Sequence, residues 1–212
     1  MLRNFTKMVV ICVLLIIPFL AYSQKDVRRR QNFDFDWKFI LNDSVEANAL
    51  NPDDSKWENV QLPHDWSIKL PLNEKNGGSM GFMPGGMGWY RKTFVIPEEY
   101  KNRKIAINFD GVYHQSNVYI NGKHLGFHPY GYTGFTYDLT PFLNFGRSNT
   151  IVVQVDHRNS PSSRWYSGSG IYRHVWLTVT NPVHVSNWGT FVSTPNVSKA
   201  KAEIKAEISI EN

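Results

Sequence analysis

Nine short segments of strand-like sequence follow one another between residues 33 and 180, and no amphipathic helix of useful length separates them. Within each segment, polar and apolar residues alternate or β-branched and aromatic residues run together, and turn-forming residues end the segments at a spacing of about ten residues. The predicted strands are 33–41, 57–62, 89–96, 104–109, 116–120, 123–127, 135–139, 149–156 and 172–180. Such a chain folds as an all-β sandwich or jelly roll.

The segment that follows residue 181 has a different character. Residues 201–211 alternate strictly, with Ile204, Ile208 and Ile210 on the apolar face and charged residues on the other. A strand of this kind buries its isoleucines against a facing sheet. Residues 182–212 are therefore predicted to begin a second, immunoglobulin-like domain, for which about 100 residues are needed, so we expect a truncated chain.

The N-terminus has the pattern of a secretory signal peptide. Arg3 and Lys7 precede the apolar run 8–20, and Ala21-Tyr22-Ser23 provides a small-residue cleavage site. Residues 1–23 are interpreted as this signal and 24–31 as a basic tail, which predicts a secreted or periplasmic protein without a membrane segment after cleavage. The single cysteine, Cys12, lies inside the signal, so no disulfide is expected.

Basic residues do not indicate a nucleic-acid partner. The formal net charge is +5, of which Arg3 and Lys7 supply two. The cluster Arg28-Arg29-Arg30 lies in the expected tail and is interpreted as solvated. No basic stripe follows it, so nucleic-acid binding is not predicted.

Residues 163–170 form a loop-like stretch of hydroxyls, glycines, one arginine and two large aromatics, which leads into the strand 172–180. Arg164 offers a planar fork of donors, and Trp165 and Tyr166 offer ring faces on which sugars stack. His64-Asp65-Trp66 offers a similar mixture at another strand end. These six residues are the predicted substrate-binding rim. The alternative is that Asp65 pairs with Arg164 and the aromatics belong to the core.

Catalytic and metal-binding patterns are not found. Glycoside hydrolysis uses two carboxyl groups, but the carboxylates are scattered, and Asp110 and Asp138 are interpreted as turn and capping residues. The histidines lack metal-ligand spacing, so no metal or other cofactor is predicted. The Gly-rich segment 73–88 is not followed by a helix or a Lys-Ser/Thr pair and is interpreted as a mobile loop that covers a ligand or another domain.

Six motifs in order resemble the N-terminal sugar-binding domain of glycoside hydrolase family 2, the β-galactosidase and β-glucuronidase family. The resemblance covers about residues 33–180, and the domain is assigned to 32–181. The motifs are Leu62-Pro-His-Asp-Trp66, Gly88-Trp-Tyr-Arg-Lys-Thr-Phe94, Phe109-Asp-Gly-Val112, Val118-Tyr-Ile-Asn-Gly-Lys123, Gly131-Tyr-Thr133 with Asp138-Leu-Thr140, and Ser163-Arg-Trp-Tyr-Ser-Gly-Ser-Gly-Ile-Tyr-Arg173.

The resemblance implies a jelly-roll, galactose-binding-like domain, then an immunoglobulin-like domain, then a TIM barrel that carries both catalytic glutamates. The implied partners are a β-galactoside-like glycan and the chain's own barrel. In several relatives an acidic residue before this Gly-Ile strand contacts the sugar, and in some it helps to hold sodium; Arg164 occupies that place here, which argues against a sodium site. The alternatives are a free-standing lectin-like module and a domain that binds a partner other than sugar.

Overall fold

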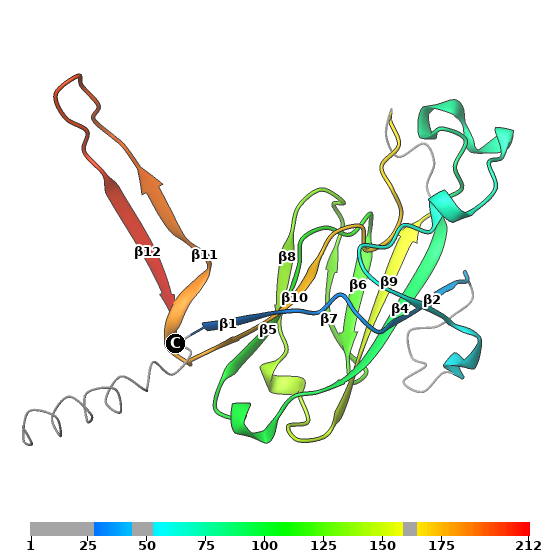
Figure 1. The fold of residues 1–212 in the computed structure, drawn as a ribbon, viewed down its shortest axis with the longest axis horizontal. Coiled ribbons are helices and arrows are strands. Elements are labelled where there is room, and N and C mark those ends of the chain that lie inside the picture. The colour runs from blue at the N-terminus through cyan, green and yellow to red at the C-terminus, as the bar shows by residue number, and fades with distance from the viewer. Residues whose placement is uncertain (1–27, 44–52, 159–164) are drawn as a thin grey trace, which may run out of the picture.

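The computed structural model describes residues 28–43, 53–158 and 165–212. The expected signal peptide 1–23 and Arg164 lie outside these described residues. The described chain forms a sandwich of a six-stranded and a four-stranded antiparallel sheet, with a separate two-stranded hairpin beside it (Figure 1). Short 3₁₀ turns connect the strands: η1 (Asp54–Lys56), η2 (Ser67–Lys69), η3 (Glu74–Asn76), η4 (Gly78–Met80), η5 (Glu98–Tyr100) and η6 (Thr140–Phe142). The predicted all-β, jelly-roll class is confirmed.

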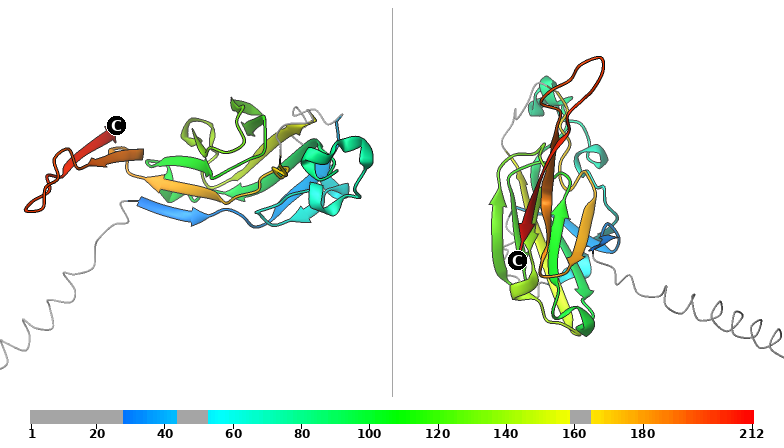
Figure 2. Two further views of the ribbon diagram at one scale, coloured as in Figure 1. Left: turned by 90° about the horizontal axis from the view of Figure 1, so that it is seen from above. Right: turned by 90° about the vertical axis from the view of Figure 1, so that its left-hand side faces the viewer.

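The sandwich places two layers of strands face to face (Figure 2). The six-stranded sheet has the order β3 (Glu58–Val60), β2 (Trp37–Leu41), β4 (Gly86–Val95), β9 (Ser148–His157), β6 (Ser116–Ile120), β7 (Lys123–His128). The four-stranded sheet has the order β1 (Arg28–Asn32), β10 (Val175–Thr180), β5 (Lys104–Phe109), β8 (Phe135–Asp138). The largest core cluster fills the space between them and includes Trp37, Tyr90, Ile107, Val153 and Leu177.

The prediction of one strand over residues 33–41 is wrong. The chain instead forms β1 in one sheet and β2 in the other, with the break at Asp36, whose φ is 58°. The buried Asp34 carboxylate stabilises this crossing, because it accepts hydrogen bonds from the backbone N–H of Val175 at 2.8 Å and from His174 Nδ1 at 2.7 Å. Strand β1 begins at Arg28, inside the segment expected to be a solvated tail, and pairs with β10.

Most other predicted strands are present. The predicted bounds of β5 and β6 agree with the structure, and those of β7, β8 and β9 differ by a residue or two. Asn121 and Gly122 have φ values of 47° and 77°, as the hairpin turn predicted from Asn-Gly requires. Strand β10 starts at Val175 rather than at the predicted residue 172, because Gly170 pairs with Tyr113 and the chain turns between them and the strand.

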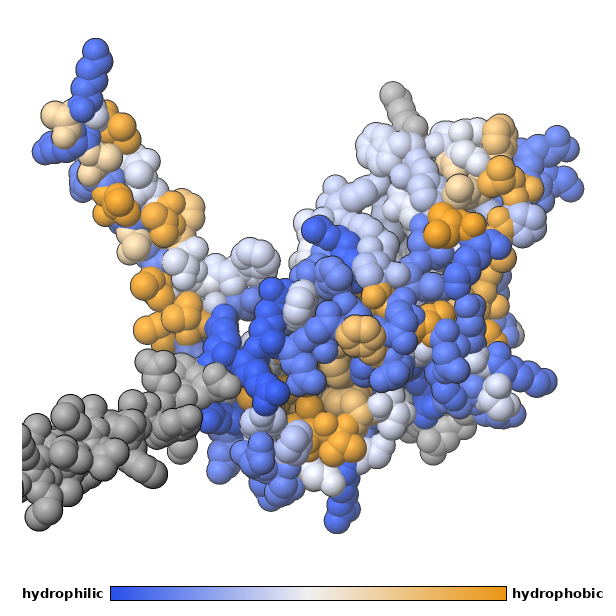
Figure 3. All heavy atoms as spheres, in the orientation of Figure 1, coloured by the Kyte–Doolittle hydropathy of each residue, from blue (hydrophilic) through white to orange (hydrophobic). Residues whose placement is uncertain are grey.

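Strands β11 (His184–Ser193) and β12 (Lys205–Glu211) form the separate hairpin. In its register Val185 lies opposite Ile210 and Thr190 opposite Ile208, so these residues share one face. Ile208 and Ile210 are 58% and 66% exposed, and orange spheres mark hydrophobic residues along the hairpin in Figure 3. The predicted immunoglobulin-like continuation remains a prediction. No helix among the described residues is both long and apolar enough to cross a membrane.

Candidate functional site

The candidate site is centred on Asp65, which joins two loops at one end of the sandwich. Its Oδ1 accepts hydrogen bonds of 3.0 Å from the backbone N–H groups of Ser67 and Ser169. Its Oδ2 accepts a hydrogen bond from the Tyr166 hydroxyl. Charge-assisted bonds of this kind are stronger than neutral ones. The carboxylate therefore fixes the chain after β9 against the chain after β3.

A chain of buried hydroxyl groups lies beneath this carboxylate. Ser67 Oγ donates to the Pro84 carbonyl at 2.6 Å and is 2.5 Å from Ser169 Oγ. Because the single Ser67 proton is used on the carbonyl, Ser169 donates to Ser67, and His157 Nδ1–H then donates to Ser169 Oγ at 2.7 Å. Burial lowers the pKa of His157 to about 4, so the ring is neutral near pH 7. The network holds the loop in place without a net charge.

His64 and Trp66, two members of the predicted rim, are only 6% and 2% exposed. Trp66 stacks on Phe39 with the ring centroids 5.5 Å apart. His64 Nδ1 lies 2.8 Å from the Tyr90 hydroxyl, and burial lowers the pKa of His64 to about 4. These two side chains therefore lie beneath the rim, and the intervening Asp65 carries the polar contact to the surface loop.

Trp165 and Tyr166 lie at the surface, 60% and 38% exposed. Burial, followed by the hydrogen bond to the Asp65 carboxylate, raises the pKa of Tyr166, so its hydroxyl stays protonated and donates. A cavity of about 370 Å³ opens beside Tyr166 and is lined by Pro63, His64, Asp65, Ile68, Tyr166, Ser167, Gly168 and Tyr172. A carboxylate and ring faces around one hollow suit the hydroxyls and C–H faces of a sugar.

Two tyrosines that sequence reasoning missed extend this aromatic surface. Tyr130 and Tyr132, in the loop between β7 and β8, are 56% and 39% exposed, with their ring centroids 5.5 Å apart. Trp165 Nε1 donates to the Tyr132 hydroxyl at 3.0 Å. The pair Tyr130-Gly131-Tyr132 is visible in the sequence, but only the folded chain places it beside Trp165.

The other predicted candidates are used elsewhere or lie outside the described residues. Arg164 is outside them, so its pairing with Asp65 is untested. Asp138 accepts from the backbone N–H of Thr140, two positions further on, as a turn residue does, and the N-cap position of η6 is Leu139. Asp110 instead accepts from Trp176 Nε1 at 2.8 Å. Within the described ranges, no three His, Cys, Asp or Glu side chains gather in a metal-binding group.

Comparison with known proteins decides the family. The family model described as "Glycosyl hydrolases family 2, sugar binding domain" matches residues 31–182. The chain belongs to glycosyl hydrolase family 2. The match contains the loops that carry Asp65 and Tyr166, so the candidate site lies within the family's sugar-binding domain.

Individual family 2 proteins agree with this assignment. A β-galactosidase of Bacteroides ovatus is 45% identical over 187 residues, which are 87% of this chain and 22% of that protein. A putative β-glucuronidase of Formosa agariphila is 40% identical over 94% of this chain and 19% of its own length. The crystal structure of a β-glycosidase from Bacteroides vulgatus is similar with a TM-score of 0.81 and 45% identity, covering 86% of this chain and 24% of that one. The chain thus spans about a fifth of these relatives.

Proposed function

We propose that this chain supplies the sugar-binding part of a secreted or periplasmic β-glycoside hydrolase that acts on a β-galactoside-like glycan. The observation that carries the proposal is the hollow beside Asp65, where a fixed carboxylate meets the rings of Tyr166 and Tyr172. The relatives named β-galactosidase and β-glucuronidase support the class of glycoside.

Hydrolysis itself is assigned to a catalytic domain outside these residues. Family 2 relatives are several times longer than the stretch they share with this chain. The carboxylates of Asp34, Asp65 and Asp138 each accept a hydrogen bond from a backbone N–H group and so stabilise the fold of the sandwich. In this proposal the Asp65 loop forms one wall of a substrate pocket. We expect the 212-residue chain to release no nitrophenol from a nitrophenyl β-galactoside.

The binding proposal is tested by titration calorimetry of the 212-residue chain with lactose and with a methyl β-glucuronide. Binding of either sugar is expected, and Tyr166→Ala should weaken it about tenfold, because stacking on a ring that lines the hollow is lost. The matched control is Phe127→Ala, which removes an aromatic ring that is 52% exposed on β7 and does not line the hollow. No heat with either sugar, or equal weakening by the control, contradicts the proposal.

A further inference from the structure

A second hollow, of about 490 Å³, lies where the β11–β12 hairpin meets the outer face of the four-stranded sheet. Its walls include Arg28, Arg30, Asp110, Arg173, Asn187 and Trp188, none of which lines the cavity beside Asp65. Hydrophilic residues gather at the base of the hairpin in the space-filling view (Figure 3). This hollow is called the arginine groove below.

The floor of the arginine groove is polar because strand alternation places polar residues on the outer face of the sheet. In β10 the residues Val175, Leu177 and Val179 are buried in the core, so Trp176 and Thr178 face outward. The register then sets Asn108 beside Trp176, and Arg30 beside Thr178. Polar residues in this pattern form a continuous surface across three strands.

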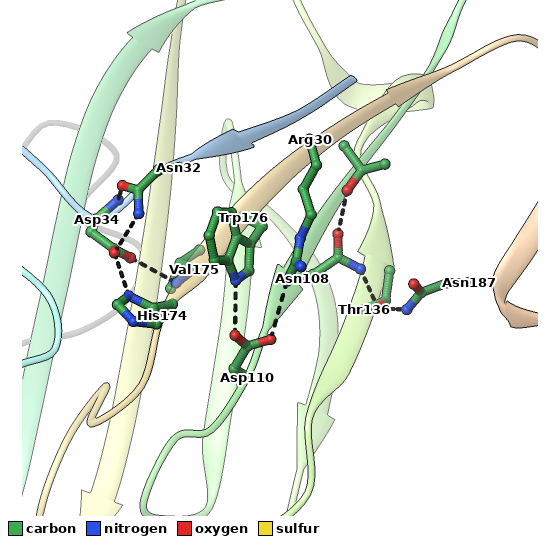
Figure 4. Close-up of polar contacts among 11 residues, drawn as sticks. Arg30, Asn32, Asp34, Asn108, Asp110, Thr136, His174, Val175, Trp176 and Asn187 are labelled. Atoms are coloured by element: carbon green, nitrogen blue, oxygen red, sulfur yellow. Dashed lines mark hydrogen bonds and ion pairs between the residues drawn. The ribbon is translucent and has the colours of Figure 1, made fainter. Parts of the chain in front are cut away.

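These floor residues hold one another in place (Figure 4). Thr178 Oγ1 donates to Asn108 Oδ1 at 2.7 Å, and Asn108 Nδ2 donates to Thr136 Oγ1 at 2.7 Å. Asn187 Nδ2, from the hairpin, donates to the same Thr136 Oγ1 at 2.8 Å. The hydrogen bonds fix both walls of the groove, so a ligand meets groups whose positions are already set.

The groove carries an excess of positive charge. The Arg30 guanidinium lies 3.9 Å from the Trp176 ring centroid, and its Nη2 is 3.6 Å from Asp110 Oδ1 (Figure 4). Trp176 Nε1 donates to Asp110 Oδ2, which holds the carboxylate beside the ring. Arg28, Arg30 and Arg173 line the groove with a single carboxylate, that of Asp110, and the Arg28 guanidinium also donates to the Val185 carbonyl of the hairpin. The charge that remains favours an anion.

We propose that the arginine groove binds an anionic saccharide unit, one that bears a carboxylate or a sulfate, at a site separate from the one beside Asp65. Guanidinium groups match the planar oxygens of carboxylate and the oxygens of sulfate through paired N–H donors. Trp188, which is 92% exposed, presents a ring face for the sugar. Asn108 and Thr136 supply amide and hydroxyl groups at the floor for sugar hydroxyls.

The test is calorimetric titration of the 212-residue chain with a glucuronate-containing disaccharide, a sulfated galactose disaccharide and their uncharged counterpart. We expect at least one anionic saccharide to bind more tightly than the uncharged one, and the carboxylate and sulfate arms show which anion is preferred. Arg173→Ala and Arg30→Gln should each weaken anionic binding about tenfold, since a charge-assisted contact is lost. Added salt should weaken it further.

A matched control and a ratio of affinities make the result specific. Arg29→Ala removes the same charge from the neighbouring position of β1, where Arg29 donates to the Tyr100 hydroxyl at 2.9 Å and does not line the groove. Because the Asp65 site is proposed to bind charged and uncharged sugars alike, the readout is the ratio of the anionic to the uncharged affinity, which only the groove variants should lower. The proposal is overturned if neither anionic saccharide binds better than the uncharged one, or if Arg29→Ala lowers the ratio of anionic to uncharged affinity as much as the groove variants do. Melting curves confirm that each variant is folded. Arg173→Ala and Arg30→Gln are two separate tests, so the proposal can still be judged if one of these variants does not fold.

Discussion

The Asp65 carboxylate accepts a hydrogen bond of 3.0 Å from the backbone N–H of Ser169, 104 positions further along the chain. The same oxygen accepts from the N–H of Ser67, two positions away. One side chain thereby joins the loop after β3 to the loop after β9. The ring of Tyr166, whose hydroxyl donates to the same carboxylate, is held beside the cavity by this connection.

Replacing Asp65 by Ala should lower the free energy of unfolding by about 2–3 kcal/mol, because two backbone N–H groups lose a charged acceptor. Asp65→Asn should cost less, about 1 kcal/mol, since an amide oxygen still accepts one of these bonds. Urea denaturation of both variants measures the difference. A change below about 0.5 kcal/mol for Asp65→Ala, the range of ordinary surface substitutions, would show that the loops are held by other contacts.

Gly170 should tolerate no side chain. Its φ is 108°, and an added Cβ would lie 2.1 Å from the Tyr90 hydroxyl oxygen. Gly77 has a φ of 75° but no atom within 4 Å of such a Cβ, so it isolates the backbone effect. We expect Gly77→Ala to cost about 1–2 kcal/mol and Gly170→Ala clearly more, as measured by thermal unfolding. Equal costs would mean that the contact with Tyr90 relaxes freely.

Stability should fall below neutral pH because two buried rings resist protonation. Burial lowers the pKa of His64 and His157 from 6.5 to about 4. Above pH 6.5 the rings are neutral in both the folded and the unfolded chain. As the pH falls toward 4, only the unfolded chain takes up these protons. The free energy of unfolding therefore decreases by up to about 3 kcal/mol for each ring. Below that pH the loss levels off.

This pH dependence is checked by urea denaturation between pH 4 and 7. His64→Gln should reduce the slope of unfolding free energy against pH, because one titrating ring is removed. His124→Gln is the control, since His124 is an exposed residue on β7 that hydrogen bonds to Asn117. An unchanged slope in His64→Gln would contradict the assigned pKa.

The sequence predicts regular strands well and misses a change of sheet. Strand β5 follows Arg103 and is followed by the Asp110-Gly111 turn. Residues next to it in the sequence therefore determine where it begins and ends. The alternation of Phe33, Phe35, Trp37 and Phe39 instead suits one continuous strand. The break at Asp36 depends on the contact of Asp34 with Val175, 141 positions away, and no local pattern records that contact.

The sequence proposes members of a candidate site but does not indicate how deeply each of them is buried. His64, Asp65 and Trp66 are adjacent, so their side chains cannot all face the solvent, and the core takes His64 and Trp66. Which of the three reaches the surface depends on packing against Phe39 and Tyr90. In the same way, the contact between Trp165 and Tyr132 depends on how the sheets close, which sequence spacing does not specify.

The buried Trp89 and the exposed Ile208 should respond very differently to truncation. Trp89 is 1% exposed, packs with Trp57, Met87 and Val152 on the outer side of the six-stranded sheet, and donates its Nε1–H to the Asn42 carbonyl at 3.2 Å. Trp89→Ala should therefore lower the free energy of unfolding by about 3–5 kcal/mol. Ile208 is 58% exposed on the hairpin, and Ile208→Ala should change it by no more than about 0.5 kcal/mol. Urea denaturation compares the two, and a large cost for Ile208→Ala would show that the apolar face of the hairpin is covered in solution.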